Sequence, residues 1–99
     1  MARLIIWSLR ATEDIESIAA YITQDSEVYA TSVIRKIIQK TRILADFPRI
    51  GRIVQEFDDE SIREIFAYSY RIIYKVSSEK IVIAAVIHGK RLLDISLKP

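Results

Sequence analysis

The sequence predicts an α+β fold of two layers, in which an antiparallel sheet packs on a helical hairpin in the order β-α-α-β-β-β, followed by a short C-terminal element. Two observations support this class. Apolar residues recur every three to four positions before Pro48 and every second position after it, so the pattern changes from helical to extended. The chain has 99 residues, 51% of them hydrophobic, which suits a single domain over residues 1–99 with one main core.

A short strand followed by a helix is expected at the N-terminus. Residues 3–7 are largely branched and apolar, which favours a strand. Ser8 follows them and is a good N-cap, because its hydroxyl accepts hydrogen bonds from backbone N–H groups that a helix start leaves unpaired. The next apolar residues share one helical face and are Ile15, Ile18, Ala19 and Ile22.

A second helix is expected to begin at Asp25 or Ser26. Its apolar stripe consists of Ala30, Val33, Ile34, Ile37, Thr41 and Leu44. It is expected to end at Phe47-Pro48, since proline disfavours helical geometry in the residue before it. Two helices joined by so short a break form a helical hairpin.

The second half of the chain is predicted to supply the remaining strands. The candidates are residues 52–57, 62–67, 70–76 and 81–87, with polar turns at 58–60 and 77–80. Residues 70–76 alternate well, and the last three candidates are expected to form an antiparallel meander. Residues 81–87 are apolar on both faces, which predicts an interior strand. The sheet face away from the helices is expected to be concave and to carry Arg71.

Several classes of protein are excluded or disfavoured by composition. The chain has no cysteine and one histidine, so neither a disulfide framework nor a metal site built on two histidines is expected. It has only two glycines, so it has no glycine-rich phosphate loop. Asp58-Asp59-Glu60 fits a polar turn better than a metal cluster. No apolar run approaches the roughly 20 residues that span a bilayer. We therefore expect a cytoplasmic protein without cofactor or metal.

Charge is distributed unevenly although the net charge is only +2. Residues 11–34 hold five acids and no base, whereas residues 35–52 hold six bases and one acid. This polarity suits an acidic partner, either a nucleic acid or an acidic protein segment. The alternative is a solvated helix surface with ordinary charges.

Two basic features stand out in the predicted sheet. Arg71 lies in the middle of a strand, where its planar guanidinium suits a phosphate or carboxylate; the alternative is an exposed arginine, or one paired across the sheet with Glu64. Residues 88–91 (His88, Gly89, Lys90 and Arg91) follow a strand end and suit anion contacts, or else a strand-ending glycine with solvated charges. Arg49 and Arg52 are attributed mainly to a turn.

Aromatic residues are expected to contribute to the core. They are Trp7, Tyr21, Tyr29, Tyr68, Tyr70 and Tyr74. Stacking on nucleic-acid bases is the alternative.

Several sequence fragments in this order resemble the ParE branch of the RelE/ParE toxin superfamily. The resemblance covers almost the whole chain and rests on Trp7-Ser8, Ala11, Asp14-Ile15, Ile18, Tyr21-Ile22, Phe47-Pro48, Gly51-Arg52, Arg63-Glu64, residues 70–74 and residues 88–91. Each fragment alone is weak, but their combination is specific.

The resemblance implies the toxin of a bacterial type II toxin–antitoxin system, which stabilises a plasmid or chromosome. A ParD-like antitoxin would neutralise it in a hetero-oligomeric complex, covering an apolar groove between helices and sheet by coupled folding. ParE-like members poison DNA gyrase, which requires no catalytic site in the toxin. The implied functional surface consists of Arg63, Arg71, His88, Lys90 and Arg91. Replacing Arg71 or Arg91 by alanine is then expected to leave the fold intact and to abolish toxicity.

Two alternatives remain within the superfamily. RelE-like members cut mRNA on the ribosome, and the catalytic residues of such an enzyme here would be Arg71, Arg91, His88 as acid and Glu64 as base. The chain places Ile62 and Glu64 at the positions of the RelE lysines, and Leu97 at that of its tyrosine, which favours the gyrase poison. The second alternative is a family member without toxicity that only binds an antitoxin.

Overall fold

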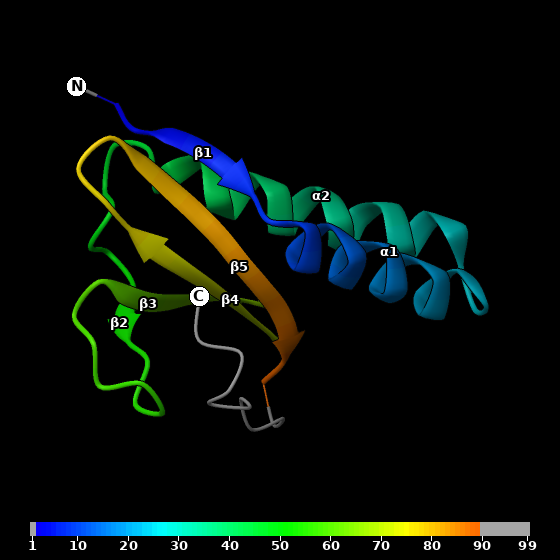
Figure 1. Cartoon of the computed structure of the whole chain (residues 1–99). Helices are drawn as coiled ribbons and strands as arrows, with labels where there is room; N and C mark the ends of the chain where they lie inside the picture. Colours follow the sequence, from blue (N-terminus) through cyan, green and yellow to red (C-terminus); the bar gives the residue numbers. More distant parts are fainter. Residues whose placement is uncertain (1, 90–99) are drawn as a thin grey trace.

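The computed structural model describes residues 2–89, and it confirms the predicted α+β class. The C-terminal element expected after residue 89 lies outside the described residues. The elements in chain order are β1 (Leu4–Trp7), α1 (Leu9–Thr23), α2 (Glu27–Ile43), β2 (Arg52–Ile53), β3 (Ile62–Ala67), β4 (Tyr70–Val76) and β5 (Lys80–His88) (Figure 1). The strand order is β1-β5-β4-β3-β2. β3, β4 and β5 form the expected meander.

One pairing differs from the expected antiparallel sheet. β1 runs parallel to β5, so the sheet is mixed. Parallel neighbours require a long crossover connection, and here both helices and strands β2 to β4 lie between β1 and β5 in sequence. β5 therefore lies between β1 and β4, as its apolar residues on both faces predicted.

Both helices begin at the predicted serines. Ser8 Oγ accepts from the backbone N–H of Ala11 at 3.0 Å, and Ser26 Oγ accepts from that of Tyr29 at 3.1 Å. α2 ends at Ile43, earlier than the expected stop at Phe47-Pro48. The chain continues there in turns, and the Phe47 N–H donates to the Ile43 carbonyl at 3.0 Å. No helix within residues 2–89 is long and apolar enough to cross a membrane.

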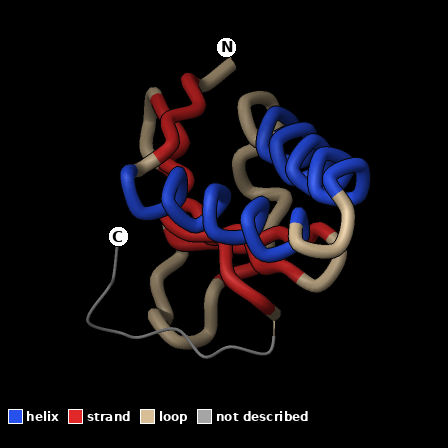
Figure 2. The backbone as a smooth tube through the Cα atoms, turned by 90° about the vertical axis from the view of Figure 1, so that its right-hand side faces the viewer, coloured by secondary structure: helices blue, strands red, loops and turns tan. Residues whose placement is uncertain are grey.

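The helices pack on one face of the sheet (Figure 2) and build the main core there. α1 lies against β5, and α2 lies against β3. The fully buried side chains in this layer include Ile37 and Leu44 from the α2 region and Ile72, Tyr74 and Ile81 from the sheet.

β5 changes its alternation at a bulge, which explains why apolar residues occupy both faces. The register with β4 shifts between Ile73, which pairs with Ala85, and Tyr74, which pairs with Ile83. Beyond the end of β1, the helix side supplies hydrogen-bond partners for the β5 edge. Ser8 Oγ donates to the Ala84 carbonyl at 3.1 Å, and Asp14 Oδ2 accepts from the Val86 N–H at 2.9 Å.

The sheet face away from the helices is not simply open. Ile62, Ile73 and Ile87 form a second buried cluster there with Val54, against which Phe57 packs. The predicted strand over residues 52–57 was too long, because β2 ends at Ile53 and the chain then turns back over this face. The Val54 carbonyl closes the turn by accepting from the N–H groups of Phe57 and Asp58, each at 3.2 Å.

Tyr74 connects this sheet to the segment that follows α2. Its side chain is fully buried, and its hydroxyl accepts a hydrogen bond from the Gly51 N–H at 3.0 Å. Burial raises the pKa of the phenol above its usual value, against smaller opposing effects of the Gly51 hydrogen bond and of Arg63 and Arg49. The folded protein therefore favours the neutral phenol.

Tyr74→Phe is expected to destabilise the protein at neutral pH and to reduce its sensitivity to alkali. The change leaves the buried Gly51 N–H unpaired, which costs about 1–3 kcal/mol of unfolding free energy. In the parent, Tyr74 titrates in the unfolded state from about its ordinary pKa of 10.0 but only at higher pH in the folded state, so its contribution to stability is lost as pH rises above that value. Urea unfolding at pH 7 and pH 11 checks both effects. An equal loss of stability with pH in parent and variant would contradict the assignment.

Candidate functional site

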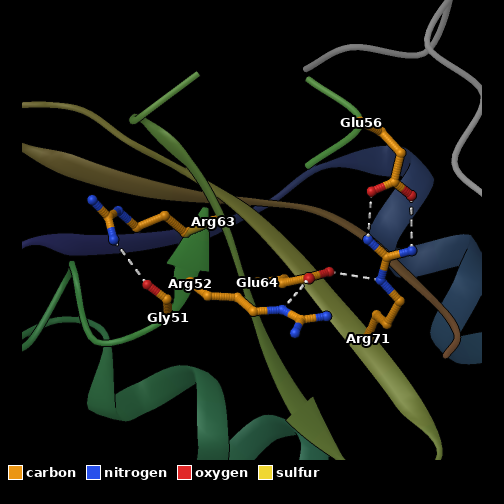
Figure 3. A network of polar contacts seen from close by, with 6 residues as sticks. All are labelled: Gly51, Arg52, Glu56, Arg63, Glu64 and Arg71. Atoms are coloured by element: carbon orange, nitrogen blue, oxygen red, sulfur yellow. Dashed lines mark hydrogen bonds and ion pairs between the residues drawn. The ribbon is translucent and has the colours of Figure 1, made fainter. Parts of the chain in front are cut away.

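A network of charged side chains, with Arg71 and Glu64 buried at its centre, lies on the sheet face away from the helices (Figure 3). Arg71 from β4 is 6% exposed and Glu64 from the adjacent β3 is 2% exposed. Glu56 reaches the same place from the turn after β2, and Arg52 from β2 itself. We call these four residues the charge network.

The guanidinium of Arg71 is held on two edges. Its Nε donates to Glu64 Oε1 at 2.6 Å. Its Nη1 and Nη2 donate to the two carboxylate oxygens of Glu56 at 3.0 and 3.1 Å, a bidentate arrangement. The second oxygen of Glu64, Oε2, accepts from Arg52 Nε at 2.7 Å. Both carboxylate oxygens of Glu64 therefore have arginine partners, and the cross-sheet Arg71–Glu64 pair that the sequence offered as an alternative is confirmed.

The protonation of Arg71 follows from these contacts. Burial alone would lower the pKa of the guanidinium, but hydrogen bonds and charge interactions with Glu56 and Glu64 outweigh it and raise the pKa above its ordinary value. Arg71 is thus permanently charged. The network joins two arginines with two glutamates, so its formal charge is zero.

A polar pocket of about 380 Å³ adjoins the network and is lined by Arg52, Gln55, Glu56, Glu64, Arg71 and Gly89. Two of these residues are acidic, and they already hold the Arg71 guanidinium. A phosphate entering the pocket would have to compete with both carboxylates. The geometry therefore makes the pocket a poor anion site.

The predicted functional residues are not brought to one surface. Arg71 and Glu64 lie on the face with the second cluster, whereas His88 pairs with Tyr70 and Arg63 pairs with Tyr74, placing both on the helix face. Lys90 and Arg91 lie outside the described residues.

Arg63 and His88 have their own neighbours on that face. Arg63 donates to the carbonyls of Glu60 and Gly51 at 3.0 and 2.9 Å. The ring of His88 meets that of Tyr70 edge-on, with centroids 6.0 Å apart. The acid–base pair of an RNase, His88 with Glu64, would thus have to act across the thickness of the sheet.

The expectation that the tyrosines pack in the core is wrong for three of them. Tyr21, Tyr29 and Tyr68 are 71%, 54% and 57% exposed, whereas Tyr74 is fully buried. Tyr70 is half-buried against the main core. Each of the three exposed rings is close to a chain turn, so the neighbouring backbone does not cover them.

An apolar groove of about 400 Å³ lies between α2 and the outer strands of the sheet. Its apolar lining includes Ile43, Ile50 and Phe66, which are 47%, 63% and 41% exposed. The guanidinium of Arg52 lies over the Phe66 ring, 4.9 Å from its centre. We call this the α2–β3 groove. The resemblance implied an antitoxin site in an apolar groove between helices and sheet, which stays a prediction.

Glu56 is the member of the charge network that the sequence did not single out. Its contact depends on the turn after β2, in a segment that the alternating pattern assigned to a strand. The sequence pattern does not indicate that the chain turns soon after Ile53, and this turn is what brings Glu56 to Arg71. Within residues 2–89, no group of three or more histidine, aspartate or glutamate side chains is placed to hold a metal ion.

Similar folds occur among solved structures. A chain described as the chromosomal ParDE system from P. aeruginosa superposes with a TM-score of 0.74 at 14% identity, covering 90% of this chain and 98% of that one. A mutant of the E. coli toxin RelE in the free state gives 0.64 at 21% identity, with 91% and 86% covered. The YoeB dimer from Staphylococcus aureus gives 0.61 at 17% identity, with 89% and 98% covered. At these identities the likeness shows the fold.

The sequence itself provides the evidence for a family. No curated protein matches it significantly. The family model for the ParE toxin of type II toxin–antitoxin systems (parDE), however, matches residues 5–93, nearly the whole chain. The chain therefore belongs to the family of ParE toxins of type II toxin–antitoxin systems.

Proposed function

We propose that the protein inhibits DNA gyrase by binding it and that a cognate ParD-like antitoxin neutralises it. The observation that carries this proposal is the charge network: Arg71, the strand arginine best suited to a phosphate, is buried and neutralised by Glu56 and Glu64. A gyrase poison requires a binding surface and no catalytic group of its own, so it tolerates this arrangement. Both gyrase and the antitoxin would be met in the cytoplasm.

The same geometry argues against an mRNA endonuclease. Attack by a ribose 2′-OH needs a base that accepts a proton and cations that stabilise the developing negative charge. Glu64 is 2% exposed, and both its oxygens already accept from Arg71 and Arg52. Without a free base near a free cation, the described part of the site does not support cleavage.

Two assays run side by side test the proposal. Purified toxin is added to gyrase in supercoiling and DNA-cleavage reactions, and separately to ribosomes translating a defined mRNA. We expect inhibited supercoiling or accumulated cleaved DNA, reversal by the antitoxin, and intact mRNA. Cleaved mRNA with unaffected gyrase would replace the proposal by the endonuclease alternative. Antitoxin binding without either activity, and without growth arrest in cells, would identify a non-toxic member.

The α2–β3 groove is the proposed binding site of the antitoxin. It combines exposed aliphatic side chains with the exposed ring of Phe66, and its rim carries Lys40 and Arg52. An apolar floor with a basic rim suits a flexible segment that alternates apolar and acidic residues and orders on binding.

Ile50→Asp is expected to weaken antitoxin binding by about tenfold or more, because it places a charge at an apolar contact. Ile50 is 63% exposed, so the toxin itself should fold as the parent does. Isothermal titration with the antitoxin measures the effect. Leu9→Asp is the matched control, since Leu9 is 76% exposed at the start of α1 and outside the groove. Equal losses for the two variants, or none for Ile50→Asp, would place the antitoxin elsewhere.

A further inference from the structure

Tyr68, in the turn between β3 and β4, has a backbone conformation and a side-chain exposure that a purely structural role does not explain. Ala67 pairs with Tyr70, so Tyr68 and Ser69 alone make the turn. Tyr68 has a φ of 54°, in the region that favours glycine, and it is one of only two non-glycine residues with positive φ within residues 2–89. A hairpin turn with positive φ at its first residue normally holds glycine there.

The side chain of Tyr68 contributes little to the packing that would offset this backbone conformation. Its side chain is 57% exposed, so the ring buries little of its surface. A bulky residue in the left-handed region is strained, and such strain is kept where the side chain has a function. Because the ring adds little to the core, its function is expected at a surface.

The turn is hydrogen-bonded to the end of β5, and the tyrosine that follows it, Tyr70, lies near two tyrosines of the helical hairpin. The Gly89 N–H donates to the Ser69 carbonyl at 2.6 Å, which fixes the end of β5 to the turn. Tyr70 follows directly, and its pKa is raised by burial and also by the nearby Tyr29 and Tyr21. Figure 1 shows the α1–α2 turn at the right-hand edge of the view and the end of β5 below its middle. We call the exposed residues Tyr21, Val28, Tyr29 and Tyr68 the tyrosine end.

The charges near the tyrosine end favour a protein partner over a nucleic acid. The exposed acids Asp25 and Glu27 lie in sequence between Tyr21 and Tyr29, where they would repel phosphates. On the opposite sheet face, Arg71 is committed to two carboxylates. Exposed tyrosines bordered by charged residues are typical of protein interfaces, in which an aromatic anchor enters an apolar pocket on the partner.

We propose that Tyr68 is the aromatic anchor through which the toxin binds its protein target. The other residues of the tyrosine end contribute to the same interface. This inference rests on the proposed function in that the target is a protein, gyrase. It separates the target surface from the α2–β3 groove assigned to the antitoxin. The occupant is thus a folded protein surface with an apolar pocket and a polar or basic rim that complements Asp25 and Glu27.

Tyr68→Gly in the full-length chain tests the inference. Glycine relieves the backbone strain, so the melting temperature should equal or exceed that of the parent. The amount of toxin needed for half-inhibition of gyrase should rise by about tenfold or more, and expression in cells should no longer arrest growth. Antitoxin affinity should not change. Tyr68→Phe keeps the ring and should retain activity, whereas Tyr68→Asn, which also tolerates positive φ, should lose it. Phe47→Ala, at an equally exposed aromatic far from this turn in sequence, should remain toxic.

The outcomes separate this inference from the proposed function. If the parent arrests growth without affecting gyrase and Tyr68→Gly does not arrest it, gyrase is the wrong target and the anchor stands. If Tyr68→Gly inhibits and arrests growth as the parent does, the anchor is refuted. A lower melting temperature for both Tyr68→Gly and Tyr68→Asn would show a structural role and refute it too. Binding of a labelled single-stranded oligonucleotide that Tyr68→Gly abolishes would refute the protein partner.

Discussion

Arg71→Ala is expected to lower the free energy of unfolding by about 3–5 kcal/mol, because it removes a buried cation that two carboxylates share, one of them buried. In the parent, Glu64 is 2% exposed and shares its oxygens between Arg71 and Arg52, while Glu56 is held by both Nη atoms of Arg71. Without the guanidinium, Glu56 loses its bidentate partner, and Glu64 keeps only the exposed Arg52. Each carboxylate must then protonate or move towards water.

Urea unfolding followed by circular dichroism measures this loss. Arg35→Ala is the matched control, since Arg35 is exposed on α2, and we expect it to change the unfolding free energy by no more than about 0.5 kcal/mol. Adding Glu56→Gln and Glu64→Gln to Arg71→Ala should recover part of the stability, because no buried charge then remains without a partner. An Arg71→Ala protein within about 1 kcal/mol of the parent would show that the network is dispensable for folding.

This prediction corrects the expectation from sequence that Arg71→Ala folds normally and loses only toxicity. The pattern placed Arg71 on the outer face of a good strand, and the structure confirms that placement. A strand pattern cannot show that the turn after β2 places Glu56 over the same face, in contact with Arg71. Loss of toxicity in Arg71→Ala therefore has to be measured at a temperature at which the variant is folded. Only a loss of toxicity in the folded variant indicates that Arg71 belongs to the surface that contacts the target.

Local features of the chain were predictable because the residues that cause them are adjacent in sequence. Ser8 and Ser26 cap their helices through backbone groups three residues away. The alternation of Tyr70 to Val76 assigned the two faces of β4, and the Arg71–Glu64 pair was one of the stated alternatives. The family resemblance likewise rested on fragments whose order along the chain is visible without a structure.

Features that depend on distant contacts were not predictable in the same way. Near the β5 bulge, the Val86 N–H donates to the carboxylate of Asp14, which lies 72 positions away in sequence. The covering of the second face depends on the chain turning after Ile53, which alternation alone does not show. The exposed ring of Tyr68 follows from a turn with positive φ, a conformation that a tyrosine gives no reason to expect.

Gly51→Ala is expected to cost about 3 kcal/mol or more, through steric overlap and a disturbed hydrogen bond together. A Cβ at this position would lie 2.5 Å from the Glu64 carbonyl oxygen and 2.6 Å from the Tyr74 hydroxyl oxygen. The first atom belongs to the backbone of β3 and the second to a fully buried side chain, so neither moves freely. Displacing the hydroxyl also disturbs its hydrogen bond with the Gly51 N–H.

Two further variants isolate the steric cause. In Gly89→Ala the nearest atom, the Ser69 carbonyl oxygen, lies 3.1 Å from the new Cβ at an exposed turn, so a shift of a few tenths of an ångström suffices and the melting temperature should hardly change. Combining Gly51→Ala with Tyr74→Phe removes one of the two close contacts but leaves the Glu64 carbonyl in place. The double variant should therefore remain less stable than Tyr74→Phe alone. Full recovery to the Tyr74→Phe level would mean that the β3 backbone yields to the methyl group, and that Gly51 is required only by the hydroxyl above it.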